Sequence, residues 1–487
     1  MTSPHRRQLL TAAMASGIGL GLGMRQASAA VSRGVQFTTS SESQSFVDRS
    51  ADVSRTPLAS YFDMDVLVRD DIAFQTVRGF GGCFNELGWV ALSALPASER
   101  TGVLRELFAP DVGASFGFCR LPIGATDLSR SAYSLNDTPG DFAMEHFSIA
   151  RDREMLIPFL KAALGQRPDM QLWASPWSPP AWMKANGHYA CARPYLPSLP
   201  DNGLPADKVC HEGENAMLLD DRHLEAYALY FRRFIEAYRA EGLRIGAVMP
   251  QNEFNSAQPF PSCTWTPEGL AKFIPKLGRQ MQPLGVDLIF GTLERGDDGL
   301  FEKVYADPEA RKYIKGIGAQ WAGRRAISFL HHAHPDLPIY QSEQECGDGA
   351  NDWRFARYSF SLMKDFFLAG AEVYDYWNLA TPTGGLSSWG WAQNALVSVD
   401  LKTGTARLNP DYHVLKQFSH FIKPGARRVD TLSINGTEDL VAFRNPDGGL
   451  VVVFRNAGAR PQAIRVAARG EVYVVTAPAD SIATLVV

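Results

Sequence analysis

Short apolar segments alternate with longer amphipathic stretches from about residue 75 onward. The stretches 154–165 and 222–242 repeat apolar residues every three or four positions, which predicts helices. Strands that alternate with helices form a parallel sheet, and eight such units predict an α/β fold of the (β/α)8 TIM-barrel type. The eight apolar segments are VRGFGGC (77–83), FGFCRLPI (116–123), QLWASPWS (171–178), IGAVMPQNE (245–253), DLIFGTLE (287–294), KGIGAQWA (315–322), PIYQSEQE (338–345) and EVYDYWNLA (372–380).

The pattern changes after about residue 425, where helical periodicity stops. Residues 439–458 read as two strands around a Pro-Asp-Gly-Gly turn, and 472–478 and 481–487 read as further strands. The segment 45–75 also has an extended pattern and is expected to pair with this tail in one small β-sandwich. The predicted organisation is a signal peptide (1–29), an extended segment joining the β-domain (30–74), a catalytic barrel (75–424) and a β-sandwich domain (425–487).

The N-terminus carries the pattern of a targeting segment. Arg6-Arg7 precede a short Gly/Ala-rich apolar stretch, and Ala27-Ser28-Ala29 fits an A-x-A cleavage site. Paired arginines before a weakly apolar stretch favour a twin-arginine signal, with an ordinary Sec signal as the alternative. We therefore expect a periplasmic or secreted protein whose mature chain starts near Ala30. No other apolar segment reaches 18 residues, so we expect no stable membrane insertion.

Composition narrows the classes of function. The 487 residues are 45% hydrophobic and carry a formal net charge of −4, with no Lys/Arg cluster in the body of the chain. This balance argues against a nucleic-acid-binding protein. The 10 Trp and 15 Tyr residues suit stacking against sugar rings, although a large core also uses aromatic side chains.

The cysteines and histidines predict no metal centre. Six cysteines are present, and their spacing fits no metal-binding template. Cys191 and Cys210 flank a Pro/Gly-rich loop and are the best candidates for a disulfide in an exported chain, whereas Cys83 and Cys119 are expected to be buried thiols. The stretch 331–334, His-His-Ala-His, reads as a helix C-terminus. We predict neither a metal nor a cofactor.

The glycines of the first apolar segment need a separate explanation. GFGG (79–82) lacks the Lys-Ser/Thr that completes a phosphate-binding loop. We therefore expect that these glycines allow close backbone packing inside the barrel.

Acidic and polar residues stand where several of the predicted strands end. Glu253 ends the fourth segment, and Glu343 and Glu345 end the seventh and share one face of a strand. In a TIM barrel the C-terminal strand ends converge on one pocket. Two carboxylates across such a pocket suit hydrolysis of a glycosidic bond, where one is the nucleophile and the other the acid and base. Periodicity alone leaves the choice between Glu343 and Glu345 open.

Seven longer motifs occur in order along the chain. They are VRGFGGCFNE (77–86), CRLPIGATDLS (119–129), SLNDTPGDF (134–142), WASPWSPPAWMK (173–184), PQNE (250–253), QSEQECGDG (341–349) and YWNLA (376–380). By these motifs the chain resembles glycoside hydrolase family 30, and within it the bacterial relatives of glucosylceramidase. The resemblance spans the whole predicted mature chain.

The resemblance implies a role for individual residues. Glu253 matches the general acid/base, and Asn252 matches the asparagine that holds the sugar 2-hydroxyl. Glu343, in a Ser-Glu pair, matches the nucleophile, which favours it over Glu345. Other matches concern the sugar pocket: Asp127, Trp177 and Trp377 correspond to residues of the −1 site, and Arg120 to a buried arginine beside the nucleophile.

Two departures from the glucosylceramidase branch affect the leaving-group side. The sixth segment reads Gln320-Trp321-Ala322 where that branch has a His-Trp-Tyr type sequence, and a long FNSAQPFPSCTW loop follows Glu253. We expect Gln320 and Trp321 to contact substrate. The expected function is a retaining β-glycosidase that hydrolyses β-glucoside-like bonds in a glycoside or oligosaccharide. The alternatives are an endo-β-1,6-glucanase, a β-1,6-galactanase or xylanase, or a non-catalytic carbohydrate-binding protein.

Overall fold

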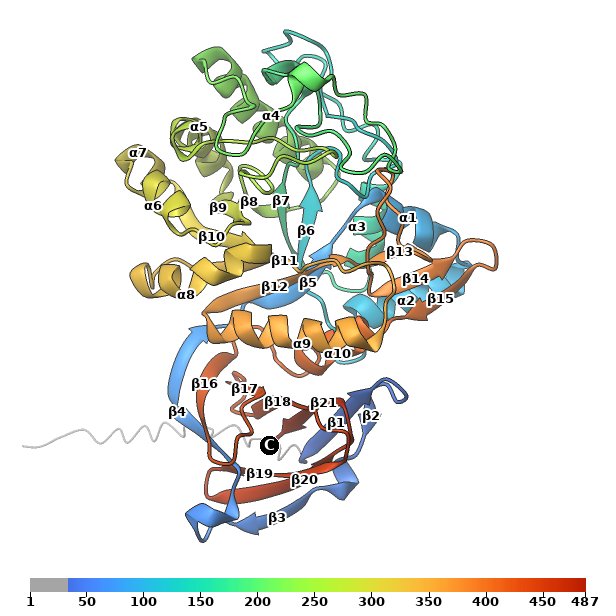
Figure 1. Cartoon of the computed structure of the whole chain (residues 1–487), viewed down its shortest axis with the longest axis vertical. Helices are drawn as coiled ribbons and strands as arrows, with labels where there is room; N and C mark the ends of the chain where they lie inside the picture. The colour runs from blue at the N-terminus through green and yellow to red at the C-terminus, as the bar shows by residue number, and fades with distance from the viewer. Residues whose placement is uncertain (1–33) are drawn as a thin grey trace, which may run out of the picture. The chain divides into compact units, whose positions relative to one another are not determined.

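Eight parallel strands close into a barrel, and they follow one another around it in chain order (Figure 1). The computed structural model describes residues 34–487. Each of the eight predicted segments supplies one strand, so the predicted barrel is confirmed. The strands are β5 (Gly79–Cys83), β6 (Phe118–Pro122), β7 (Gln171–Ser175), β8 (Ile245–Val248), β9 (Asp287–Leu293), β10 (Ile314–Gln320), β11 (Ile339–Glu343) and β12 (Ala371–Asn378).

Helices connect successive barrel strands, and half of the ten described helices begin at a residue whose side chain caps them. The predicted helices 154–165 and 222–242 are α3 (Leu156–Leu164) and α4 (Asp221–Ala240). The Asp220 side chain accepts a hydrogen bond from the backbone N–H of His223 at the start of α4. The other helices are α1 (Glu86–Ser93), α2 (Ala97–Phe108), α5 (Pro267–Met281), α6 (Gly299–Tyr305), α7 (Pro308–Arg311), α8 (Arg324–Ala333), α9 (Trp353–Leu368) and α10 (Pro410–Ser419).

The second sheet combines strands from both ends of the described chain. Its order is β2-β1-β21-β18-β17-β16-β4-β19-β20-β3. The N-terminal strands are β1 (Gln36–Ser41), β2 (Val47–Asp48), β3 (Ser54–Pro57) and β4 (Val66–Thr76). The C-terminal strands are β16 (Arg427–Ser433), β17 (Leu440–Arg444), β18 (Leu450–Asn456), β19 (Gln462–Ala468), β20 (Glu471–Ala477) and β21 (Ser481–Val486). The predicted β-sandwich is therefore present, and β4 pairs with β16 while β1 pairs with β21.

A small three-stranded sheet lies between the barrel and the sandwich in sequence. It consists of β13 (Ala380–Pro382), β14 (Val397–Asp400) and β15 (Thr405–Leu408). The sequence pattern did not predict it. The irregular segment between β13 and β14 returns to the barrel and contributes to the pocket described below.

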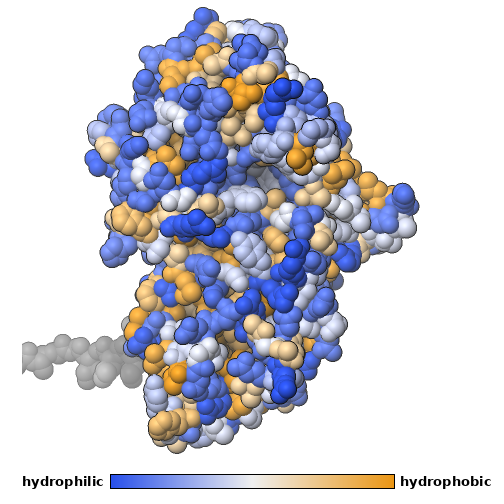
Figure 2. Space-filling model, viewed as in Figure 1, coloured by the Kyte–Doolittle hydropathy of each residue, from blue (hydrophilic) through white to orange (hydrophobic). Residues whose placement is uncertain are grey.

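The predicted signal segment, residues 1–29, lies outside the described residues and stays a prediction. Within residues 34–487, no helix combines the length and the apolar character needed to cross a membrane. Figure 2 shows hydrophobic residues scattered in small groups over one face of the molecule, which is normal for a protein surface.

All six cysteines lie within the described residues, and all six are free thiols. Cys83 and Cys119 are buried as predicted. The predicted Cys191–Cys210 disulfide is wrong. The two backbones are adjacent, with the Cys210 N–H donating to the Cys191 carbonyl at 2.8 Å. The two thiols contact each other as free side chains, and they also donate to the carbonyls of Ser262 (3.4 Å, from Cys191) and Lys208 (3.9 Å, from Cys210).

The glycines of β5 allow close backbone packing, as the sequence predicted. A Cβ on Gly81 would lie 1.7 Å from the Phe118 carbonyl oxygen and 2.4 Å from Asp375 Oδ1. A Cβ on Gly79 would lie 2.9 Å from the Phe118 Cβ. The first of these contacts is with backbone on the neighbouring strand, so it cannot be relieved by moving a side chain.

Gly81→Ala is therefore expected to destabilise the protein by about 3 kcal/mol or more, the upper range for overpacking a core. Gly102→Ala is the matched control. Gly102 lies inside α2 with no atom within 4 Å of its added Cβ, so helix propensity is expected to stabilise this variant by about 0.5–1 kcal/mol. Urea denaturation measures both changes, and equal midpoints for the two variants would contradict the packing argument.

Candidate active site

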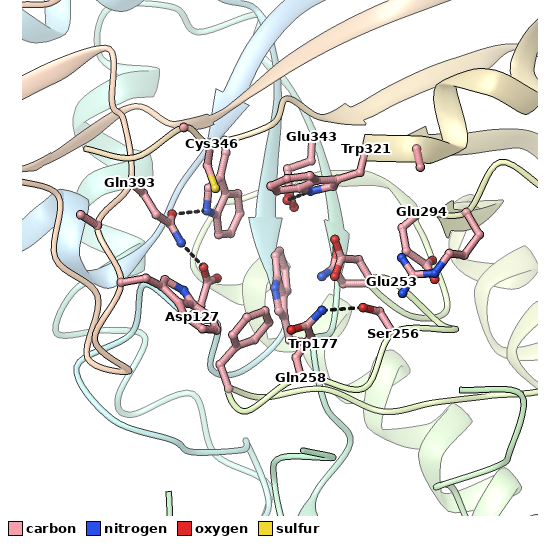
Figure 3. A pocket seen from close by; sticks show the side chains of 18 residues that line it. Asp127, Trp177, Glu253, Ser256, Gln258, Glu294, Trp321, Glu343, Cys346 and Gln393 are labelled. Carbon is pink, nitrogen blue, oxygen red and sulfur yellow. Dashed lines mark hydrogen bonds between the residues drawn. The ribbon is translucent and has the colours of Figure 1, made fainter. Parts of the chain in front are cut away.

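Side chains from the C-terminal ends of the barrel strands line one cavity of about 400 Å³ (Figure 3). This is the edge at which TIM barrels carry their functional residues. Of the predicted site residues, all but Gln320 line it. The lining side chains include Asp127, Trp177, Asn252, Glu253, Ser256, Gln258, Phe260, Glu294, Arg295, Trp321, Glu343, Cys346, Trp377, Trp391 and Gln393.

Glu343 is held by two nitrogen donors. It is the last residue of β11 and is 6% exposed. Arg120 Nη1 donates to its Oε2 at 2.7 Å, and Trp321 Nε1 donates to its Oε1 at 3.1 Å. Burial raises the pKa of Glu343 above its ordinary value, and the Arg120 charge and the Trp321 hydrogen bond limit that rise. Both contacts favour the ionised carboxylate.

Glu253 has a different environment in the same cavity. Its side chain is partly accessible from the cavity, and its carboxyl Oε1 accepts a hydrogen bond from Gln320 Nε2 at 3.3 Å. Burial and the negative charge of Glu343 raise the pKa of Glu253 well above its ordinary value. Glu253 therefore retains its proton when Glu343 is ionised. Such a pair, with its pKa values pushed apart, is suited to acid–base and nucleophilic roles respectively.

The backbone at Glu253 adopts an uncommon conformation. Its φ of 46° lies in the left-handed region, where a residue other than glycine is strained. The N–H of Glu253 donates to Thr292 Oγ1 at 2.8 Å, which ties this backbone to the end of β9. Trp321 has a φ of 51° and donates to Glu343, so both carboxyl environments depend on unusual backbone geometry.

Asn252 is fixed so that its amide nitrogen is available to a ligand. Its Oδ1 accepts from Arg120 Nη2 at 2.7 Å and from Gln320 Nε2 at 3.2 Å. With the oxygen occupied, Nδ2 remains as the donor. Gln320 lies behind the cavity wall, where its Oε1 accepts from Ser342 Oγ at 2.9 Å. It contacts Asn252 and Glu253 instead of lining the cavity.

The other predicted sugar-binding residues gather on one side of the cavity. Trp177 and Trp377 stack with ring centroids 5.2 Å apart. Gln393 links Trp377 to Asp127: its Oε1 accepts a hydrogen bond from Trp377 Nε1 at 2.7 Å, and its Nε2 donates one to Asp127 Oδ2 at 2.5 Å. Burial raises the pKa of Asp127 to about 7. The arrangement presents aromatic faces and polar atoms together, as sugar recognition requires.

Glu345 does not line the cavity. Its carboxylate is paired with Arg324 and accepts a hydrogen bond from Tyr358 Oη at 2.8 Å. Of the two glutamates that the strand pattern left open, only Glu343 reaches the cavity.

Sequence reasoning missed Gln393 and Glu294. Gln393 lies in the irregular segment between β13 and β14, which carries no periodic signal. Glu294 directly follows β9, the same place after a strand that drew attention to other candidates, so the strand-end rule would have found it. Within residues 34–487, no group of three or more His, Cys, Asp or Glu side chains is arranged to hold a metal ion.

Comparison with known proteins agrees with this geometry. The Glycosyl hydrolase family 30 TIM-barrel domain matches residues 77–198 and 205–422, and the family 30 beta sandwich domain matches residues 425–485. The mouse (Mus musculus) lysosomal acid glucosylceramidase is 30% identical over 79% of this chain and 75% of its own length. The endo-1,6-beta-D-glucanase of Neurospora crassa is 27% identical over 82% of each chain.

A solved structure gives the same architecture. The crystal structure of SrfJ from Salmonella typhimurium superposes with a TM-score of 0.80 at 24% identity and covers 93% of this chain and 99% of that chain. At this identity the likeness shows the fold alone. The two family domains, however, together match most of the chain. The chain therefore belongs to glycoside hydrolase family 30 and is a glycoside hydrolase.

Proposed function

We propose that the protein is a retaining β-glycosidase that acts on a glucose-like sugar, with Glu343 as nucleophile and Glu253 as general acid and base. The observation that carries this proposal is the unequal environment of the two carboxyls. Glu343 accepts from a guanidinium and an indole, whereas Glu253 accepts only from an amide among the described side chains. A double displacement needs this difference, because one carboxyl must be ionised while the other holds a proton.

The chemistry proceeds in two balanced steps. In the first, the Glu343 carboxylate bonds to the anomeric carbon, the bond from that carbon to the leaving oxygen breaks, and the proton of Glu253 passes to that oxygen. In the second, Glu253 takes a proton from water as the water oxygen attacks the anomeric carbon and releases Glu343. Two inversions return the sugar in its original configuration.

The remaining side of the cavity suits the sugar that stays bound to Glu343. The Asn252 amide is oriented to donate to a hydroxyl close to the anomeric carbon. Asp127, Trp177 and Trp377 provide a polar atom and two aromatic faces farther along the ring. The names of both curated relatives specify a glucosyl unit, which supports a glucose-like sugar here.

An endo-β-1,6-glucanase is the second candidate, supported by the Neurospora relative of that name. The two candidates differ in the leaving group and share the chemistry at the anomeric carbon.

A screen of aryl β-glycosides (glucoside, fucoside, galactoside, xyloside and glucuronide) tests the proposal, followed by ¹H NMR of the first product. We expect the glucoside to be hydrolysed fastest and the β-anomer to appear before mutarotation produces the α-anomer. An α-anomer formed first would contradict the double displacement, and no hydrolysis of any of the five would contradict the proposed activity.

A further inference from the structure

The cavity continues past Glu253 on the side away from Asp127. Figure 3 places Asp127 and Gln393 at one side, Glu294 at the other, and Glu253 and Glu343 between them. Glu294 lines this second side, and Ser256 and Gln258 lie between it and the Asp127 side (Figure 3). In the proposed function Glu253 delivers its proton to the leaving oxygen. The leaving group must therefore occupy the space beside Glu294.

Glu294 is a buried carboxyl without a partner. It is 1% exposed, yet it lines the cavity, and neither of its carboxyl oxygens makes a hydrogen bond within the described residues. Burial raises the pKa of Glu294, and the Arg295 charge and the nearby backbone N–H groups of Glu294 and Asn255 offset this only partly. Burying a carboxyl without hydrogen-bond partners lowers the stability of the folded protein. A ligand that supplies the missing hydrogen bonds would explain its presence.

The charges around Glu294 indicate which ligand fits. Arg295 is ion-paired with Glu212, which does not line the cavity. Burial raises the pKa of Glu294 to about 8 despite the Arg295 charge. A protonated carboxyl offers one donor and one acceptor. A neutral hydroxyl has the same two capacities and needs no counter-charge, whereas the charge of Arg295 is already taken up by Glu212.

The neighbouring wall is polar and aromatic. Gln258 Nε2 donates to Ser256 Oγ at 2.6 Å, and the hydroxyl of Tyr195 donates to Gln258 Oε1. Tyr195 also stacks on Trp391, with centroids 5.9 Å apart and an interplanar angle of 15°. Tyr195 belongs to the long segment between β7 and β8, which therefore reaches the cavity mouth. Polar atoms beside aromatic faces suit a second sugar ring.

We propose that Glu294 binds a hydroxyl of the leaving group, and that this leaving group is a neutral sugar, so that the natural substrate is a β-linked oligosaccharide. The inference rests on the proposed function. An alkyl leaving group would fill the same space but leave Glu294 unpaired, so this site discriminates against glycolipids.

The test compares β-linked glucose disaccharides with octyl β-glucoside, whose leaving alcohol is also unactivated but has no further hydroxyls. In Glu294→Leu, the ratio of kcat/KM for the best disaccharide to kcat/KM for octyl glucoside is expected to fall about tenfold or more, mainly through the disaccharide KM. Glu294→Gln keeps a donor and an acceptor and is expected to retain most of the ratio. Glu309→Leu, the same change at an exposed position of α7, is expected to leave the ratio at the wild-type value.

Other outcomes separate the alternatives. A ratio within twofold of wild type in Glu294→Leu would overturn the inference. Equal losses on both substrates with a lower melting temperature would assign Glu294 a structural role instead. If the wild-type protein hydrolysed no β-glycoside, the proposed function would fail. Calorimetric titration of the disaccharides would then decide the inference separately, since Glu294→Leu should still weaken binding about tenfold.

Discussion

Replacing Glu343 with glycine is expected to lower kcat on an aryl β-glucoside by about 10⁴–10⁶-fold, the scale observed when a covalent nucleophile is removed. The loss is large because no other described carboxylate in the cavity accepts hydrogen bonds from both a guanidinium and an indole nitrogen. Steady-state kinetics with p-nitrophenyl β-glucoside measures it. Labelling with a 2-fluoro-glucoside followed by peptide mapping should place the label on Glu343.

Glu345→Gly is the matched control for this experiment. Glu345 lies two residues farther along the chain and is paired with Arg324 outside the cavity. Since partly exposed ion pairs contribute little to stability, turnover in this variant should stay within a few-fold of wild type. A label on Glu345, or loss of turnover in Glu345→Gly with Glu343→Gly still active, would reverse the assignment.

Replacing Glu253 with glutamine is expected to have an effect that depends on the leaving group. For a disaccharide, kcat/KM should fall about 10²–10⁴-fold, because the leaving oxygen needs a proton from this carboxyl. For a dinitrophenyl glucoside, whose leaving group needs no proton, kcat/KM should change little. The kcat for the dinitrophenyl glucoside should fall nonetheless, because no base activates water in the second step. Added azide should restore this kcat and give β-glucosyl azide. Equal losses of kcat/KM on both substrates would contradict the role of Glu253 as general acid.

The pH profile provides a second measurement on the same variant. Glu253 must be protonated in the first step, and its pKa is raised above that of an ordinary glutamate. Wild-type activity should therefore persist above the pKa of an ordinary glutamate and be lost as the pH rises through the raised pKa of Glu253. Glu343 must be ionised, so activity is also lost as pH falls through its pKa. In Glu253→Gln the alkaline limb should disappear with the activated substrate while the acidic limb remains.

The barrel could be predicted because its strands are buried on both faces. Such strands form continuous apolar segments that end in polar residues, and the eight segments map onto β5 to β12. The sheet β13–β15 escaped prediction because its strands are only three or four residues long and are joined by glycine-containing segments without periodicity. The sequence correctly placed Cys191 and Cys210 beside each other, but the structure keeps them as contacting free thiols and not as a disulfide.

Site residues could be predicted from the sequence when they lie on a barrel strand or close to its end. Glu253, Asn252, Trp177 and Trp377 stand on strands or within a few residues of their ends, and the family resemblance implied their roles. Gln393 could not be predicted in the same way, because it reaches Asp127 from an irregular segment 266 residues away in sequence. The sequence likewise could not predict that the Glu294 carboxyl lacks a hydrogen-bond partner, because this depends on how the surrounding groups pack.

The shared sheet of N-terminal and C-terminal strands constrains the order of events during synthesis. β4 leaves the ribosome roughly 350 residues before its partner β16, which at about 5–20 residues per second is a delay of about 20–70 s. β1 waits longer still, because its neighbour β21 (Ser481–Val486) is farther from it in sequence than β16 is from β4. The barrel can therefore close while β4 still has an unpaired edge, and a chain that stalls before β16 exposes an edge to which other nascent chains can pair.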